Sequence, residues 1–228
     1  YDNAILAMTY LEGFQVTGDK MFASVARETL DYVLREMTDP KGGFFSAQDA
    51  GDVGKEGEFY VWKESELRSL LSAEEFDALQ KGYSITPQGN FEHQTNVFSV
   101  LDNVPWSDRS TPLFRSAQRK LLDARNRRQH PHLDDKVLTS WNGLMIAAFA
   151  KGHQVLGDAR YLSAAQRAAS FIQQTLEKDG KLLHRYRDGN SALRATLDDY
   201  AFLIHGLLAL YESDFDLRWI RWAEKLQA

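Results

Sequence analysis

The stretch NGLMIAAFAKGHQVLGDARYLSAA (142–165) decides the fold of this chain, because a closely matching stretch occurs near its start. That earlier stretch is NAILAMTYLEGFQVTGDKMFASVA (3–26), and the two align without a gap at an offset of 139 positions, from Asn3 to Asn142. A fainter third copy begins near Asp198. Internal repeats of this kind indicate one structural unit that is used several times.

Each copy predicts a helical hairpin. The first helix, at 2–16, 141–156 and 198–212, is apolar almost all round and should be buried on most sides. A Gly-Asp pair then ends that helix and caps the next. The second helix, at 19–38 and 158–177, is amphipathic, and in the middle copy one apolar stripe holds Tyr161, Leu162, Ala165, Ala169, Ile172 and Leu176. Buried inner helices paired with half-exposed outer helices predict an all-α, two-layer ring.

Long links separate the repeated units. The second and third copies are 58 positions apart, from Gly143 to Ala201, which exceeds the 34 residues of a tetratricopeptide repeat. The additional residues lie in the links at 42–62 and 180–197. Both links contain glycines typical of turns and residues typical of β-strands, so each predicts a short β-hairpin. Further helices are expected at roughly 63–82 and 110–128, with a polar loop at 89–101 between them.

The composition bounds the classes of protein to consider. The chain has 228 residues, a net charge of -5 and no cysteine. Without cysteine there are no disulfides and no thiolate chemistry, and the acidic balance argues against nucleic acid as a partner. No signal peptide or membrane-spanning stretch is visible, so a cytoplasmic location is expected. The chain opens on Tyr1 in mid-pattern, so it reads as a segment of something longer.

The repeat geometry predicts where a ligand site should lie. If all inner helices run the same way, their N-termini and the long links share one end of the ring. Concave sites with aromatic walls and a few converging polar groups are the usual ligand sites. The residues expected at this mouth are Asp2, Asn3, Asp49, Asp52, Glu58, Tyr60, Trp62, Asp134, Asp135, Trp141, Asn142, Tyr186, Asp198, Asp199 and Tyr200.

Each of these residues also has a purely structural interpretation. Asp2, Ser140 and Asp198 could be helix N-caps. The acids of the 42–62 link could be solvated turn residues, and the tryptophans could belong to the core. The histidines also have more than one possible role. His205 reads as a core histidine, whereas His184, in a link strand near the predicted mouth, could act as a general acid or base. The spacing of HPHLDD (130–135) is not a specific zinc pattern, so no metal and no cofactor is expected.

The segment DDKVLTSWNGLMIAA (134–148) closely resembles the thioredoxin-domain-containing proteins of the spermatogenesis-associated type. The resemblance is carried further by YDNAILAMTYLEGFQVTGD (1–19), GGFFSAQDAGD (42–52), GEFYVW (57–62), GNFEHQTNV (89–97) and LDDYAFLIHGLLALYE (197–212). It implies an (α/α)6 toroid similar to six-hairpin glycosidases and N-acylglucosamine 2-epimerases. It also implies a thioredoxin-like domain, absent here, in the full-length chain. Residues 1–228 are therefore expected to be a single partial toroid domain, truncated at both ends.

Together these inferences favour a carbohydrate-active domain, a sugar hydrolase or isomerase. Asp199 and Asp49 are the predicted acid–base pair, because glycoside chemistry needs two carboxyl groups in different environments. The predicted substrate-binding residues are Asp2, Asn3, Asp52, Tyr60, Trp62, Asp135, Trp141, Asn142, Asp198 and Tyr200. Two alternatives stay open: a non-catalytic sugar- or peptide-binding domain that serves the thioredoxin-like domain, and a helical-repeat scaffold.

Overall fold

A computed structural model describes residues 1–51, 57–101, 105 and 109–228. The chain divides into two compact units. Unit 1 comprises residues 1–47 and 133–228, and unit 2 comprises residues 48–132. Short strands β1 (Ala47–Gln48) and β4 (Leu133–Asp134) lie where the chain passes from one unit to the other.

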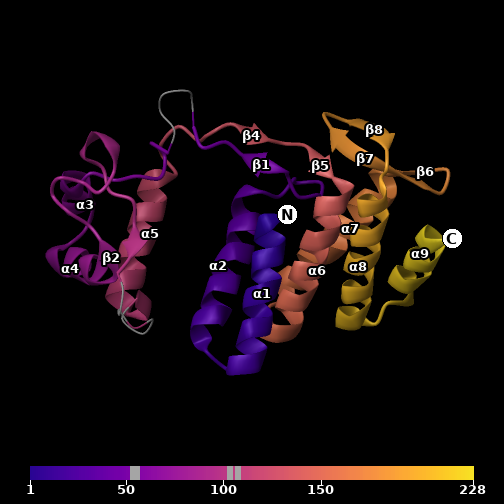
Figure 1. Cartoon of the computed structure of the whole chain (residues 1–228), viewed down its shortest axis with the longest axis horizontal. Helices are drawn as coiled ribbons and strands as arrows, with labels where there is room; N and C mark the ends of the chain where they lie inside the picture. Colours follow the sequence, from indigo (N-terminus) through magenta and orange to yellow (C-terminus); the bar gives the residue numbers. More distant parts are fainter. Residues whose placement is uncertain (52–56, 102–104, 106–108) are drawn as a thin grey trace. The chain divides into compact units, whose positions relative to one another are not determined.

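Unit 1 contains three helical hairpins, as the repeats predict. The inner helices are α1 (Asp2–Thr17), α6 (Thr139–Leu156) and α8 (Leu197–Asp214). The outer helices are α2 (Lys20–Glu36), α7 (Ala159–Thr175) and α9 (Leu217–Gln227). Helix α6 packs between α1 and α8 (Figure 1). The expected fold class, part of an α/α toroid built of helical hairpins, is confirmed.

The hairpin turns use the predicted cap chemistry. Gly18 and Gly157 end α1 and α6 in the left-handed region, each with φ 71°. In the third copy Phe215 takes this position with φ 56°. The outer helices then begin at aspartate caps whose side chains accept backbone N–H groups two residues later, at Asp19, Asp158 and Asp216.

The inner helices run in the same direction. At their starts, the Tyr1 and Trp141 rings lie 5.1 Å apart, and the Ser140 N–H donates to Asp199 at 2.9 Å. Near their ends, Gln154 of α6 donates to the hydroxyl of Ser213 of α8 at 2.8 Å. The N-termini of α1, α6 and α8 therefore share one end of unit 1 (Figure 1).

Helices α6 and α8 approach so closely that their backbones touch. A Cβ added to Gly143 would overlap the Phe202 carbonyl, and one added to Gly206 would lie 2.5 Å from the Gly143 oxygen. Glycine at both positions removes this obstacle, so α6 and α8 pack backbone to backbone.

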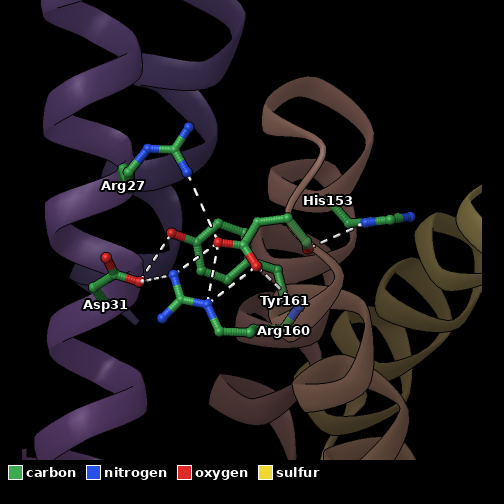
Figure 2. Close-up of polar contacts among 6 residues, drawn as sticks. Arg27, Asp31, His153, Arg160 and Tyr161 are labelled. Carbon is green, nitrogen blue, oxygen red and sulfur yellow. Dashed lines mark hydrogen bonds and ion pairs between the residues drawn. The ribbon is translucent and has the colours of Figure 1, made fainter.

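A charged network joins the outer helices α2 and α7 (Figure 2). The buried Tyr161 hydroxyl donates to Asp31 at 3.0 Å, and Arg160 bridges Asp31 and Asp158 at 3.2 and 2.7 Å. Burial, together with the Asp31 carboxylate, raises the pKa of the Tyr161 hydroxyl. The hydroxyl therefore stays protonated and keeps its role as donor.

A small antiparallel sheet lies at the N-terminal ends of α6 and α8. It contains β5 (Val137–Leu138), β6 (Glu177–Lys178), β7 (Lys181–Arg187) and β8 (Asn190–Arg194), with β7 paired to all three others. The β7–β8 pair confirms the hairpin expected at 180–197. In the described part of 42–62 there is only β1, so the hairpin expected in that link is not found there.

Unit 2 has its own helices and its own core. Its elements are α3 (Glu64–Leu70), α4 (Ala73–Gly82), β2 (Tyr83–Ser84), η1 (Glu92–Gln94), β3 (Ser99–Val100) and α5 (Pro112–Arg125). Trp62, Phe76 and Phe114 belong to the core. The helix expected at 63–82 is broken at Ser72, whose side chain caps α4.

Glu75 ties α4 to α5 in unit 2. This residue is only 5% exposed, and it accepts from Lys120, the Ser72 N–H and Ser116 at 2.7, 2.8 and 2.8 Å. Lys120, followed by the two other donors, lowers the pKa of Glu75 from 4.5 to about 2. The folded state thus holds the ionised carboxylate more strongly than the unfolded chain does.

We expect Glu75→Gln to lower the free energy of unfolding by about 2 kcal/mol at neutral pH, because charge-assisted hydrogen bonds are lost. A carboxylate with a depressed pKa stabilises the fold above its unfolded pKa, and this contribution disappears as pH falls. The difference between wild type and variant should therefore shrink as pH falls from 4.5 towards 2. Urea unfolding across this pH range, with exposed Asp77→Asn as control, tests this; a pH-independent difference would contradict it.

Candidate functional site

The starts of α6 and α8 meet at the carboxylate of Asp199, which is 0% exposed. Its Oδ1 accepts the Ser140 N–H at 2.9 Å. Its Oδ2 accepts the Thr196 N–H at 2.8 Å and the Thr196 hydroxyl at 3.1 Å. Asp199 therefore satisfies otherwise unpaired amides at the N-termini of two helices, where a negative charge is also favoured.

The same carboxylate holds the imidazole of His184. Nδ1 of His184 lies 2.8 Å from Oδ2 and 3.1 Å from Oδ1 of Asp199. The alternation along β7 explains the contact, because His184 shares the inward face of the strand with the buried Leu182 and Tyr186. The His184 side chain is nevertheless 30% exposed, so one part of the ring reaches solvent.

This pairing determines the chemistry available to His184. The Asp199 oxygens act as acceptors towards two backbone amides, so the hydrogen between the two side chains belongs on Nδ1. In the neutral tautomer with its hydrogen on Nδ1, Nε2 carries the lone pair and can take up a proton, which the ring can later return. An imidazole oriented by a buried carboxylate is a common form of general base.

Aromatic rings lie at the same end of unit 1. Trp141 follows Ser140 and is half-buried, and its ring meets that of Tyr1, which is 50% exposed, at an angle of 57°. Tyr200 is also half-buried, and its hydroxyl accepts the Leu182 N–H at 3.1 Å. The first two rings form an accessible apolar surface, whereas the Tyr200 hydroxyl fixes β7.

Asn142, although predicted to bind substrate, has its amide occupied by the backbone. It is 1% exposed. Its Oδ1 accepts the Phe44 N–H at 2.7 Å, and its Nδ2 donates to the carbonyls of Phe44 and Leu138 at 2.9 Å each. Asn142 thus fastens the loop around Phe44 to the start of α6.

The other predicted residues of unit 1 lie around this end. Asp2 and Asp198 are exposed in the first turns of α1 and α8, and Asn3 is half-buried. The helices start one to two residues earlier than the N-cap alternatives require, at caps Tyr1, Leu138 and Thr196. Asp135 forms an ion pair with Arg187 at 2.7 Å. His205 is exposed on α8, so its interpretation as a core histidine was wrong.

The remaining predicted residues belong to unit 2. Asp49 has an exposed side chain, and its N–H donates to the His132 carbonyl at 2.8 Å. Tyr60 is 40% exposed, and its hydroxyl donates to Gln48 at 3.0 Å. Trp62 is 4% exposed and packs in the core under the Arg128 guanidinium, 3.9 Å from the ring centre. Asp52 lies outside the described residues.

Unit 2 also contains a cavity of about 430 Å³, and Glu58, Phe59 and Val61 of the loop at 58–61 line it. Arg128 organises this loop by donating to the carbonyls of Glu58, Phe59 and Val61 at 3.3, 2.8 and 2.9 Å, and it pairs with Glu66 at 2.9 Å. The Arg128 guanidinium thus stabilises the loop that lines the cavity.

The described ranges contain neither a cluster of metal-ligating side chains nor a membrane-spanning helix. No group of three or more histidine and carboxylate side chains there is arranged to hold a metal ion. Within the same ranges, no helix is both long and apolar enough to cross a membrane.

The fold and the site thus define an all-α protein of helical hairpins with a histidine–aspartate pair where its inner helices begin. No protein-family model matches the sequence. The chain is 33% identical to human spermatogenesis-associated protein 20 and 32% identical to the rat protein, and each match covers 100% of this chain. The chain is therefore a homologue of spermatogenesis-associated protein 20, which confirms the resemblance seen in the motifs. It spans 34% of the length of these relatives.

Solved structures of low sequence identity also match. Cellobiose 2-epimerase from Spirochaeta thermophila is 14% identical with a TM-score of 0.39, covering 90% of this chain and 53% of that one. Unsaturated glucuronyl hydrolase from Bacillus sp. GL1 is 14% identical with a TM-score of 0.37, covering 99% of this chain and 59% of that one.

Proposed function

We propose that this protein acts on a carbohydrate at the end of unit 1 where the inner helices begin, with His184 transferring the proton. The observation that carries the proposal is the buried Asp199 carboxylate, which holds a partly exposed imidazole at 2.8 Å. Asp199 acts through His184 as a positioning residue, because its own oxygens are occupied. From the sequence alone, Asp199 is a predicted catalytic residue, whereas His184 is only an alternative general acid or base.

The surroundings of the pair suit a sugar. The neighbouring Trp141 and Tyr1 rings offer an apolar surface on which the C–H face of a sugar can stack. Asp198 and Asn3 lie in the first turns of α8 and α1 and can bond hydroxyl groups. This combination of ring surfaces and a few polar groups is typical of small-molecule sites.

The pair favours isomerisation over glycoside hydrolysis. Hydrolysis needs two carboxyl groups that reach the scissile bond. Asp199 already accepts from Ser140, Thr196 and His184, so it is not available to a sugar. A single base suffices for aldose–ketose interconversion, in which Nε2 removes the proton from C2 and returns it to C1 on the same face. The hydroxyl proton moves in the same sense, from O2 to O1, so that the sugar gains and loses no atoms.

The experiment is a deuterium-exchange screen of aldoses and ketoses with the full-length protein in D₂O. We expect one sugar to gain deuterium at C1 or C2, read by NMR. His184→Gln should slow this exchange at least about 100-fold, because a general base is lost. The matched control is His205→Gln on the exposed face of α8, which should exchange like wild type.

The same screen separates catalysis from simple binding. If a sugar binds without any deuterium gain, the non-catalytic alternative is supported, in which the domain serves a thioredoxin-like domain elsewhere in the full-length chain. If His184→Gln exchanges like wild type, the assignment of His184 is wrong.

The predicted cytoplasmic location stays a prediction, which fluorescence microscopy of the tagged full-length protein would test.

A further inference from the structure

A second polar feature lies on the outer wall of unit 1, where the loop after α2 meets α7. Asp39 shapes this loop, because its side chain accepts the Lys41 N–H at 2.7 Å and its carbonyl accepts the Gly42 N–H at 2.8 Å. Gly42 has φ 126°, and a Cβ there would lie 2.8 Å from the Arg167 carbonyl oxygen. Glycine therefore lets the loop approach the α7 backbone, which places Lys41 beside that helix.

Lys41 is also held by its side chain. Its Nζ donates to the Tyr186 hydroxyl at 3.1 Å and lies 5.8 Å from the centre of that ring. Tyr186 belongs to β7 and is 8% exposed, so it provides a fixed anchor. The hydrogen bond to Tyr186 thus holds the ammonium group of Lys41 in a defined position.

Helix α7 presents a polar stripe to this ammonium group. Ser163, Arg167, Ser170 and Gln174 follow one another at spacings of four, three and four residues, so they share one helix face. Arg167 donates to the Ser163 hydroxyl at 2.8 Å, which orients its guanidinium. Lys41 and this stripe line one groove of about 240 Å³.

The charges in the groove are unbalanced. Lys41 and Arg167 both line it, and none of the described residues lining it is acidic. Neither cation forms an ion pair with a carboxylate among the residues that the structure describes. The whole chain has 32 acidic residues and 27 lysines and arginines. A shortage of acidic partners therefore does not explain why neither Lys41 nor Arg167 forms an ion pair.

We infer that this groove binds a phosphate or sulfate group, that is, a tetrahedral oxyanion of a small molecule. The guanidinium offers two parallel donors, the ammonium a point charge, and the two serines hydroxyl donors, which together match a doubly charged anion. The site lies on an outer helix and requires no role for His184, so it stands independently of the proposed isomerase.

The test is a calorimetric titration of the protein with inorganic phosphate and with sulfate, at constant ionic strength set by chloride. We expect phosphate to bind at least tenfold more tightly than chloride. Arg167→Gln and Lys41→Gln should each weaken phosphate binding at least tenfold, and Arg167→Lys should weaken it less. Arg115→Gln and Lys20→Gln remove the same charge at exposed positions that do not line the groove, and both variants should bind like wild type.

A second arm separates the oxyanion from whatever carries it. A sugar phosphate that binds at least as tightly as inorganic phosphate, with the same loss in both groove variants, supports a phosphorylated ligand. An uncharged sugar that shows this pattern would overturn the inference, as would groove variants that bind phosphate like wild type. Circular dichroism of each variant ensures that lost binding is not lost folding.

Discussion

Replacing Gly143 by alanine should destabilise the protein by at least about 3 kcal/mol, a large part of the 5–15 kcal/mol that holds a typical domain together. The added Cβ would overlap the Phe202 carbonyl of α8. Side-chain overlap can be relieved by a change of rotamer, but here backbone meets backbone, so the two helices must separate. Separation would open gaps along α6, whose residues 142–150 are all buried.

A matched glycine makes this prediction specific. Gly13 lies inside α1, and a Cβ there would meet only the Phe22 ring, at 3.4 Å, which is ordinary contact. Gly13→Ala should therefore stabilise the protein by about 0.5–1 kcal/mol, because alanine is the better helix former. Urea unfolding of both variants measures the difference. Equal effects at Gly143 and Gly13 would contradict the close approach of α6 and α8.

Removing the Asp199 side chain should have an effect of similar size. Asp199→Ala leaves the Ser140 and Thr196 amides and the His184 ring without their acceptor. Each buried group without a partner costs about 1–3 kcal/mol, so we expect a loss of roughly 3–5 kcal/mol. Asp199→Asn keeps one acceptor oxygen, so it should lower the free energy of unfolding by about half as much.

The adjacent acid is the natural control. Asp198 is exposed in the same turn, so Asp198→Ala should change the free energy of unfolding by less than about 0.5 kcal/mol. Unfolding curves for the three variants, followed by far-UV circular dichroism, test the contrast. A similar loss in Asp198→Ala and Asp199→Ala would show that Asp199 is not the junction of α6 and α8.

Most of the fold could be predicted from local sequence signals. The apolar inner helices, the amphipathic α7 stripe and the Gly-Asp turns each depend on residues within a few positions of one another. The start of α6 was placed two residues late because Ser140 is a competent cap, whereas the helix begins at Thr139 after Leu138. Element ends depend on such competition and are the least certain part of a sequence-based prediction.

The candidate site could be predicted only in part. The shared end of the inner helices followed from the repeat, since copies of one unit that wind the same way bring their starts together. The pairing of His184 with Asp199 was missed, although one signal was available. In LLHRYR (182–187) the apolar Leu182 and Tyr186 stand two residues to either side of His184, which places the imidazole on the buried face of a strand.

The sequence by itself determined the repeated hairpins, their turns and the end at which polar and aromatic groups gather, because periodicity and cap chemistry act over a few residues. Only the tertiary structure decided how those groups are used. Asn142 bonds Phe44 across 98 positions and Asp199 bonds Ser140 across 59. Hydrogen-bond partners so far apart are selected by how the helices pack, so the same polar residue can fasten a loop or orient a base.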